Sequence, residues 1–170
     1  MDFARVQGSA LVGGNPGPAW HLAGAADFDA DGRSDLLWQN NNGQAVIWTM
    51  AGTQVTGGVT VNGNAGPSWH AVGAGDFNGD GRADILFQND NGQAAVWFMN
   101  GGQIAGGANI GGNPGPGWRA MGAADLNLDG KADILWQDGS GQAVVWYVDG
   151  AQVTGAAAIT PNPGPDWQLV

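Results

Sequence analysis

The chain contains no cysteine, no glutamate, few basic residues and no long hydrophobic run, and each absence removes a class of protein. Without cysteine, neither a disulfide framework nor a cysteine-based zinc site holds the fold together. The five basic residues are too few and too scattered for the basic stripe that nucleic-acid binding needs. No apolar run approaches the roughly 18 residues of a membrane span, so we expect no membrane insertion.

Glycine, tryptophan and aspartate are abundant instead. The 32 glycines follow no Gly-X-Y period, which excludes collagen, and 43% hydrophobic against 12% charged residues excludes a disordered chain. All 15 acidic residues are aspartate, and ten of them fall in three short segments. The net charge of -10 is therefore concentrated at a few places, which indicates cations as partners.

An internal repeat organises the chain. Trp20, Trp69, Trp118 and Trp167 are each 49 residues apart and close the similar strings NPGPAW, NAGPSW, NPGPGW and NPGPDW. The aspartate-rich segments and the Gly-Gln-Ala tripeptides keep the same interval without insertion or deletion. We predict a single repeat array over 1–170, made of a partial repeat 1–19, full repeats 20–68, 69–117 and 118–166, and the start of a fourth at 167–170.

Each repeat is predicted to be β throughout. In the first repeat we expect strands near 21–28, 35–39, 44–50 and 54–61, because short β-branched and aromatic runs are divided there by Gly, Asn, Asp and Pro. Four strands per 49 residues predict an all-β fold of β-propeller-type blades, each a four-stranded antiparallel meander. The small residues of the first strand suit a crowded axis, and the later Trp and Ile residues suit packing between blades. A β-solenoid is the alternative.

A recurring loop predicts calcium binding. It reads D-x-[D/N]-x-D-G-x-x-D, which places oxygen-bearing side chains at alternate positions and a glycine at position 6, where the chain must turn sharply. Ca²⁺ takes six to eight oxygen ligands, so a main-chain carbonyl at position 7 and the carboxylate at position 9 complete the site. The predicted ligands are Asp27, Asp29, Asp31, Arg33 and Asp35; Asp76, Asn78, Asp80, Arg82 and Asp84; and Asp125, Asn127, Asp129, Lys131 and Asp133.

The loop fits neither an EF-hand, a magnesium site nor a simple turn as well as it fits a calcium site. An EF-hand needs glutamate at position 12, where this chain has Trp38, Phe87 or Trp136. Mg²⁺ prefers a tighter octahedron, and Asp-Gly as a mere turn signal does not explain the same ligand types three times. So many carboxylates without a cation would repel one another. We therefore expect about three Ca²⁺ ions, one per repeat.

The segments GAADFDADGRSDLLW (24–38), GAGDFNGDGRADILF (73–87) and GAADLNLDGKADILW (122–136) resemble FG-GAP/VCBS repeats, the integrin-like calcium-binding blades. The resemblance implies a β-propeller with Ca²⁺ between the first and second strands of each blade. Where the family usually has Gly-Ala-Pro after the second strand, this chain reads WQN, FQN and WQD. Family propellers usually have seven blades. Three blades cannot close a ring, so we expect either a fragment or self-association, with two chains giving six blades.

Three functions remain open, none of them enzymatic. The first is a calcium-stabilised module for adhesion or protein binding. The second is a lectin that holds carbohydrate through loop tryptophans Trp20, Trp69, Trp118 and Trp167, although packing between blades explains these residues as well. The third is a purely structural element. His21 and His70 align with Arg119 and are expected to be surface residues. No signal peptide is visible, but calcium sites of extracellular modules bind in the range of about 10⁻⁴–10⁻³ M, which favours an extracellular location.

Overall fold

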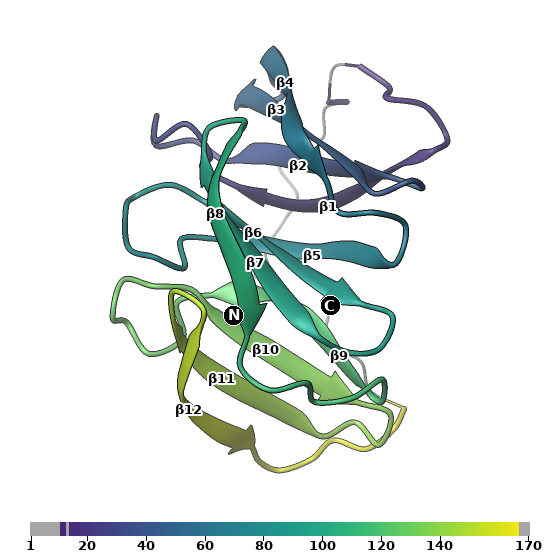
Figure 1. Cartoon of the computed structure of the whole chain (residues 1–170), viewed down its shortest axis with the longest axis vertical. Coiled ribbons are helices and arrows are strands. Elements are labelled where there is room, and N and C mark those ends of the chain that lie inside the picture. The colour runs from purple at the N-terminus through teal and green to yellow at the C-terminus, as the bar shows by residue number, and fades with distance from the viewer. Residues whose placement is uncertain (1–10, 13, 167–170) are drawn as a thin grey trace, which may run out of the picture.

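The computed structural model describes residues 11–12 and 14–166 as three four-stranded sheets that follow one another along the longest axis (Figure 1). All twelve assigned elements are strands, and in the described part of the chain no helix is long and apolar enough to cross a membrane. Each sheet is one blade, and the three blades form an array that does not close on itself. The predicted all-β, propeller-type architecture is therefore confirmed.

The strands of each blade are neighbours in the order of the chain and pair antiparallel throughout. The first blade contains β1 (Trp20–Ala26), β2 (Asp35–Asn40), β3 (Gln44–Ala51) and β4 (Gln54–Asn64). The second contains β5 (Trp69–Gly75), β6 (Asp84–Asn89), β7 (Ala94–Asn100) and β8 (Gln103–Ile110). The third contains β9 (Trp118–Ala124), β10 (Asp133–Asp138), β11 (Ala143–Asp149) and β12 (Gln152–Ile159).

The predicted strands lie where expected, with small shifts at their ends. β1 stops at Ala26 instead of 28, because Asp27 and Phe28 already belong to the aspartate-rich loop. β4 continues to Asn64 because the side-chain amide of Gln44 donates to the carbonyls of Val61 and Gly63 and holds the strand end. The Gly-Gln-Ala tripeptide thus secures the last strand of its own blade.

The first strands of the blades contact one another, β1 with β5 and β5 with β9. A Cβ added to Gly24 would touch the backbone of Gly73 and Ala74. One added to Gly73 would press on the backbone of Gly122 and Ala123. The small residues of these strands therefore let neighbouring backbones approach closely, which agrees with the sequence-based expectation.

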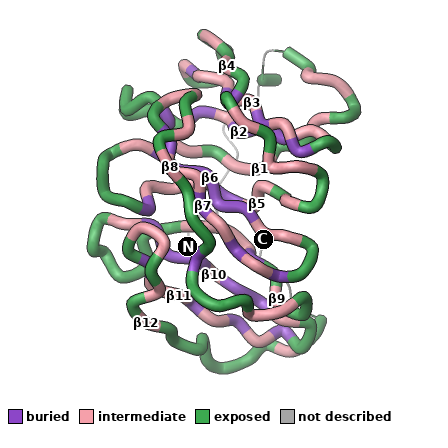
Figure 2. Tube along the Cα trace, in the orientation of Figure 1, coloured by how far each residue is buried: buried purple, intermediate pink, exposed green. Residues whose placement is uncertain are grey.

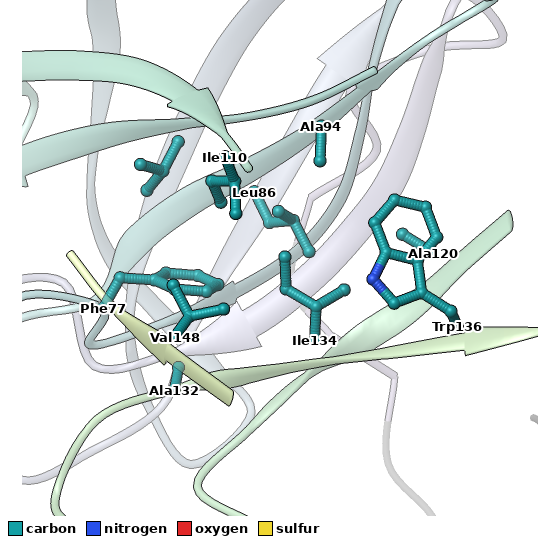
Figure 3. Close-up of a cluster of buried hydrophobic side chains, with 10 residues drawn as sticks. Phe77, Leu86, Ala94, Ile110, Ala120, Ala132, Ile134, Trp136 and Val148 are labelled. Atoms are coloured by element: carbon teal, nitrogen blue, oxygen red, sulfur yellow. The ribbon is translucent and has the colours of Figure 1, made fainter. Parts of the chain in front are cut away.

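Two hydrophobic cores lie between the blades. The first joins Phe28, Leu37 and Ile47 of the first blade to Ile85 and Phe87 of the second. The second core joins the next two blades in the same way, with Ile134 and Trp136 of the third blade against Phe77 and Leu86 (Figure 3). The buried parts of the chain in Figure 2 accordingly lie mainly where sheets face each other, and the outer strands β4, β8 and β12 are mostly exposed.

The predicted partial repeats fall largely outside the described residues. This applies to most of the pattern expected over 1–19, to the repeat start at 167–170 and to Trp167. The repeat boundaries and the self-association expected from the blade count stay predictions.

Candidate metal centre

Each aspartate-rich loop joins the first and second strands of a blade and curls through two left-handed residues. In the first loop these are Ala30 and Gly32, with φ of 63° and 83°. Gly79 and Gly81 take the same conformation in the second loop, and Leu128 and Gly130 in the third. A non-glycine residue in this conformation costs roughly 1–2 kcal/mol, so the rest of the loop must compensate at Ala30 and Leu128.

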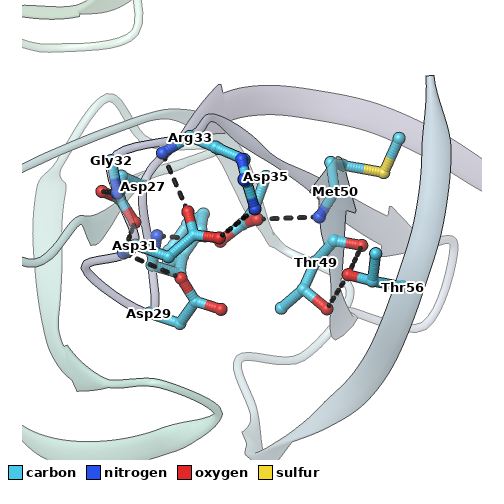
Figure 4. A network of polar contacts seen from close by, with 10 residues as sticks. Asp27, Asp29, Asp31, Gly32, Arg33, Asp35, Thr49, Met50 and Thr56 are labelled. Atoms are coloured by element: carbon cyan, nitrogen blue, oxygen red, sulfur yellow. Dashed lines mark hydrogen bonds and ion pairs between the residues drawn. The ribbon is translucent and has the colours of Figure 1, made fainter. Parts of the chain in front are cut away.

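Hydrogen bonds from the backbone to the aspartates hold the curl. The N–H of Asp31 donates to Oδ1 of Asp27 at 3.1 Å and to Oδ1 of Asp29 at 3.2 Å (Figure 4). The N–H of Gly32 donates to the other Asp27 oxygen at 2.7 Å. Left-handed residues and carboxylate acceptors together turn the chain around a small space lined by oxygen atoms.

Three carboxylates converge in the first loop. One oxygen each of Asp27, Asp29 and Asp35 lies within 4.8 Å of the other two. Like charges at this spacing repel by about 1–3 kcal/mol per pair at surface dielectrics, so a divalent cation would offset this repulsion. Hard oxygen donors are what Ca²⁺ prefers, and this donor set fits that ion.

Asp31 is not part of this convergence. Its Oδ2 forms an ion pair with the Arg33 guanidinium at 3.2 Å, and its Oδ1 accepts the Arg33 N–H at 2.8 Å. Ligation by Asp31 would require its side chain to leave Arg33, and ligation by the Arg33 carbonyl stays a prediction. The structure thus brings together three of the four carboxylates predicted for this loop.

The second and third loops repeat the curl with one carboxylate fewer. Asp76 accepts the N–H groups of Gly79, Asp80 and Gly81, and Asp125 accepts those of Asp129 and Gly130. The amide nitrogen of Asn78 donates to Asp80 at 3.1 Å, as that of Asn127 does to Asp129 at 2.9 Å. Asparagine therefore avoids part of the repulsion that a fourth carboxylate would cause, at the cost of one charged ligand.

The aspartate at position 9 has a second role that the sequence reasoning missed. Asp35 is fully buried and accepts two backbone N–H groups. One comes from Phe28 inside the loop, and the other comes from Met50 at the end of β3, as Figure 4 shows. Asp84 and Asp133 are equally buried and make the same pair of bonds. This carboxylate therefore ties the loop to the third strand of its blade as well as facing the other carboxylates.

Burial also changes the acidity of these aspartates. Loss of water contact raises the pKa of Asp84 to about 6 from an ordinary 3.8, against the two backbone hydrogen bonds that lower it. The charges of Asp80 and Asp76 raise this pKa further. Burial raises the pKa of Asp35 in the same way. A bound cation would favour the charged form and oppose both shifts.

Neighbouring loops are also linked to each other. The N–H of Ala83 donates to the Asp27 carbonyl at 2.8 Å, and the N–H of Ala132 donates to the Asp76 carbonyl at 2.7 Å. The Arg82 guanidinium donates to the Asp29 carbonyl at 3.2 Å. The first two loops are thus each positioned partly by the next blade, and Arg82 takes part in the first of these contacts, whereas Lys131 pairs with Asp149.

The loop tryptophans lie at the start of the first strands. Trp20, Trp69 and Trp118 are half-buried, and Trp69 and Trp118 pack against the inter-blade cores. Trp20 lines a hollow of about 200 Å³ together with Pro16, Trp38 and Trp48. Packing between blades therefore accounts for Trp69 and Trp118. Carbohydrate binding by any of the loop tryptophans stays a prediction.

The two histidines lie on exposed strand positions, as expected. His21 pairs with Asn41 and His70 pairs with Asp90, each at 2.7 Å. Both contacts join the first strand of a blade to the turn that follows its second strand, so a structural role explains them.

A family model described as FG-GAP-like repeat matches residues 27–87 and 76–136. Each match begins at the first aspartate of one loop and ends in the second strand of the next blade, and the two overlap across the second loop. Together they span more than half of the chain. No curated protein matches it.

Proposed function

The chain belongs to the FG-GAP-like repeat family, and from this premise we propose that it is a non-enzymatic, calcium-binding repeat module for protein binding or adhesion. The family is generally non-enzymatic, often binds calcium and is typical of extracellular proteins. An extracellular location therefore belongs to the proposal, because the millimolar calcium found there matches the affinity of about 10⁻⁴–10⁻³ M common in extracellular modules.

The convergence of Asp27, Asp29 and Asp35 is the observation that supports calcium most directly. These three side chains would hold the ion in the first loop, with Asp31 joining once it leaves Arg33. Asp76, Asn78, Asp80 and Asp84, and their counterparts in the third loop, would hold two more. The bound ion would supply positive charge that offsets the repulsion between the carboxylates. Because each loop joins the first and second strands of a blade, an ion in the loop would also stabilise the pairing of these two strands.

The stabilising role predicts a large effect of calcium on thermal unfolding. We expect the melting temperature to rise by several degrees or more between excess chelator and millimolar calcium, because an ion that binds only the folded chain stabilises it by mass action. Calorimetric titration should give about three ions per chain. A melting temperature that is the same in chelator and in calcium would contradict calcium binding.

Position 3 of the aspartate-rich loop allows a sharper test, because it is aspartate in the first loop and asparagine in the other two. Asp29→Asn should leave the first site able to bind, with an affinity lowered toward that of the other two. Asp29→Ala removes the oxygen and should abolish binding at this site, so that titration counts one ion fewer. Asp90→Asn makes the same charge change outside the loops and should leave all three sites intact. Equal titrations for Asp29→Ala and Asp90→Asn would refute the assignment.

A further inference from the structure

The contact between consecutive blades occurs twice and uses the same positions each time. We call the side of a blade that meets the following blade its forward face, and the side that meets the preceding blade its back face. The forward faces of the first two blades bury Phe28 and Val61, or Phe77 and Ile110, at 0–2% exposure. The back faces of the second and third blades bury Ala83, Ile85, Phe87 and Met99, or Ala132, Ile134, Trp136 and Val148.

The forward face of the third blade carries the same kind of residues but remains exposed. Leu126 is the counterpart of Phe28 and Phe77, and 45% of it is exposed. Ile159 is the counterpart of Val61 and Ile110, and 42% of it is exposed. The third blade therefore presents an apolar surface that the other two blades bury.

The back face of the first blade is exposed in the corresponding way. Leu22 is 56% exposed, whereas its counterparts Ala71 and Ala120 pack in the inter-blade cores. Val55 is 36% exposed, whereas its counterparts Ile104 and Val153 pack against those cores. Of the seven large hydrophobic residues that are exposed in the described chain, four thus belong to these two faces.

Polar groups on the two faces also match. Arg82 and the N–H of Ala83 bond to main-chain carbonyls of the preceding loop, at Asp29 and Asp27. The first-blade counterparts are Arg33, which turns back onto Asp31 and is 61% exposed, and Ser34, which is exposed. The forward face of a third blade, docked against these two residues, would offer them the equivalent carbonyls of Asn127 and Asp125.

The segment that precedes the first blade contacts that blade in the same way as the segment that precedes the second blade contacts the second blade. Gly14 lies against the ring of Trp48, as Gly63 lies against that of Trp97 in the next blade. Pro16 lines the hollow beside Trp48. Among the residues that the structure describes, no neighbouring sheet covers the back face of the first blade.

We propose that a second copy of this chain docks head to tail, with the back face of its first blade on the forward face of the third blade. The contact continues an interface that the molecule already forms twice, and the two faces differ, so the interface is heterologous. Two such contacts close a pair of chains into a ring of six blades. The proposal concerns a partner and does not depend on calcium binding.

The mass of the chain in solution tests this directly. Light scattering and sedimentation should give twice the mass of one chain, 17.3 kDa, for the unmodified protein. Leu126→Asp and Leu22→Asp, on opposite faces, should each lower the pair affinity by more than tenfold. Leu128→Asp places the same charge in the same loop, at a position whose counterparts Ala30 and Gly79 lie outside the buried cores, and should leave pairing unchanged.

Mixing the two impaired variants distinguishes head-to-tail docking from other modes. Each variant keeps one intact face, so the mixture should form pairs through the single undamaged contact, whereas each variant alone stays monomeric. Circular dichroism confirms folding, and Ile159→Asp replaces Leu126→Asp if that variant does not fold. An unmodified chain that is monomeric, or pairs that survive both substitutions, or a mixture that stays monomeric, would overturn the proposal.

Discussion

At the scale of single residues, the aspartate at position 9 combines two functions. Its carboxylate faces the other acidic groups of the loop, and both of its oxygens also accept backbone N–H groups, as Asp84 does from Phe77 and Met99. Removing a buried acceptor of this kind typically costs about 1–3 kcal/mol, because the donors lose their partner. The residue therefore matters to the fold even in the absence of a cation.

The raised pKa of Asp84 gives a pH dependence that chelator should reveal. The folded protein holds the proton up to about pH 6, whereas the unfolded chain releases it near 3.8. This group therefore adds stability that is complete below about pH 3.8 and is lost as the pH rises through about 6. The melting temperature in chelator from pH 4 to 7 should fall less steeply for Asp84→Asn than for the unmodified chain. Identical slopes would contradict the raised pKa.

At the scale of elements, turns pack against turns. Gly92 follows β6 with φ of 96°, and a Cβ there would overlap the carbonyl group of Gly115, in the turn before β9. Gly43 and Gly141 stand in the same relation to Gly66 and Gly164. The glycine of each Gly-Gln-Ala tripeptide therefore packs against the backbone of the Gly-Pro turn that follows its blade.

Gly92→Ala should accordingly destabilise the protein by about 3 kcal/mol or more, since backbone overlap adds to the cost of positive φ. Gly115→Ala is the matched control, because Gly115 has φ of 92° but nothing within 4 Å of an added Cβ. That substitution should cost only about 1–2 kcal/mol. Urea unfolding of both variants measures the difference, and equal losses would contradict turn-on-turn packing.

A glutamine side chain connects each blade to the next. The Gln39 amide accepts the N–H of Ala71 at 2.8 Å and donates to the carbonyl of Trp69 at 2.9 Å, which fixes β2 against β5. Gln88 makes the same bonds to Ala120 and Trp118. This glutamine is the middle residue of the WQN and FQN segments, where the chain departs from the usual family sequence.

Gln39→Met keeps the volume but leaves two backbone groups of the next blade, and the carbonyl of Gly43, without this partner, so we expect a loss of about 1–3 kcal/mol in unfolding free energy. Gln54→Met changes an exposed glutamine of the same blade and should have almost no effect. Chemical denaturation compares them. If the two variants lose the same stability, the inter-blade role of Gln39 is wrong.

At the scale of the whole molecule, electrostatic repulsion between the acidic loops opposes the hydrophobic stacking of the blades. The blades stack through apolar cores, while a net charge of -10 gathers largely in loops that neighbouring blades bring close together. Three divalent ions would supply six positive charges and reduce the net charge from -10 to -4. The array should therefore respond to ionic strength most strongly when calcium is removed.

Raising the salt concentration from about 0.01 M to about 1 M shortens the screening length from about 30 Å to about 3 Å. We expect the melting temperature in chelator to rise by roughly 2–4 °C for each kcal/mol of repulsion that salt screens. In saturating calcium the rise should be clearly smaller. Scanning calorimetry with potassium chloride measures both, and equal rises would mean that repulsion between the loops contributes little to stability.

Much of this protein could be predicted from its sequence. The strands follow from local chemistry, because β-branched and aromatic runs alternate with turn residues, and the 49-residue period fixes how many blades there are. The loop positions follow equally locally, since Gly32 and its counterparts must take positive φ for the chain to curl. These features depend on residues near one another in the chain.

The tertiary structure decided which contacts those elements make. Asp35 bonds to Met50, 15 residues away, and Gln39 bonds to Ala71, 32 residues away. The sequence did not identify the partners of Asp35 and Gln39. A strand pattern predicts which residues share one face of a strand, but it does not predict which other strand that face packs against. Only the folded blade shows that Asp35, predicted as a calcium ligand, also bonds to Met50 of β3. Only the stacking of the blades leaves Leu22 and Leu126 exposed where their counterparts are buried. The physical reason is that burial is a property of two surfaces in contact, and one surface alone does not specify it.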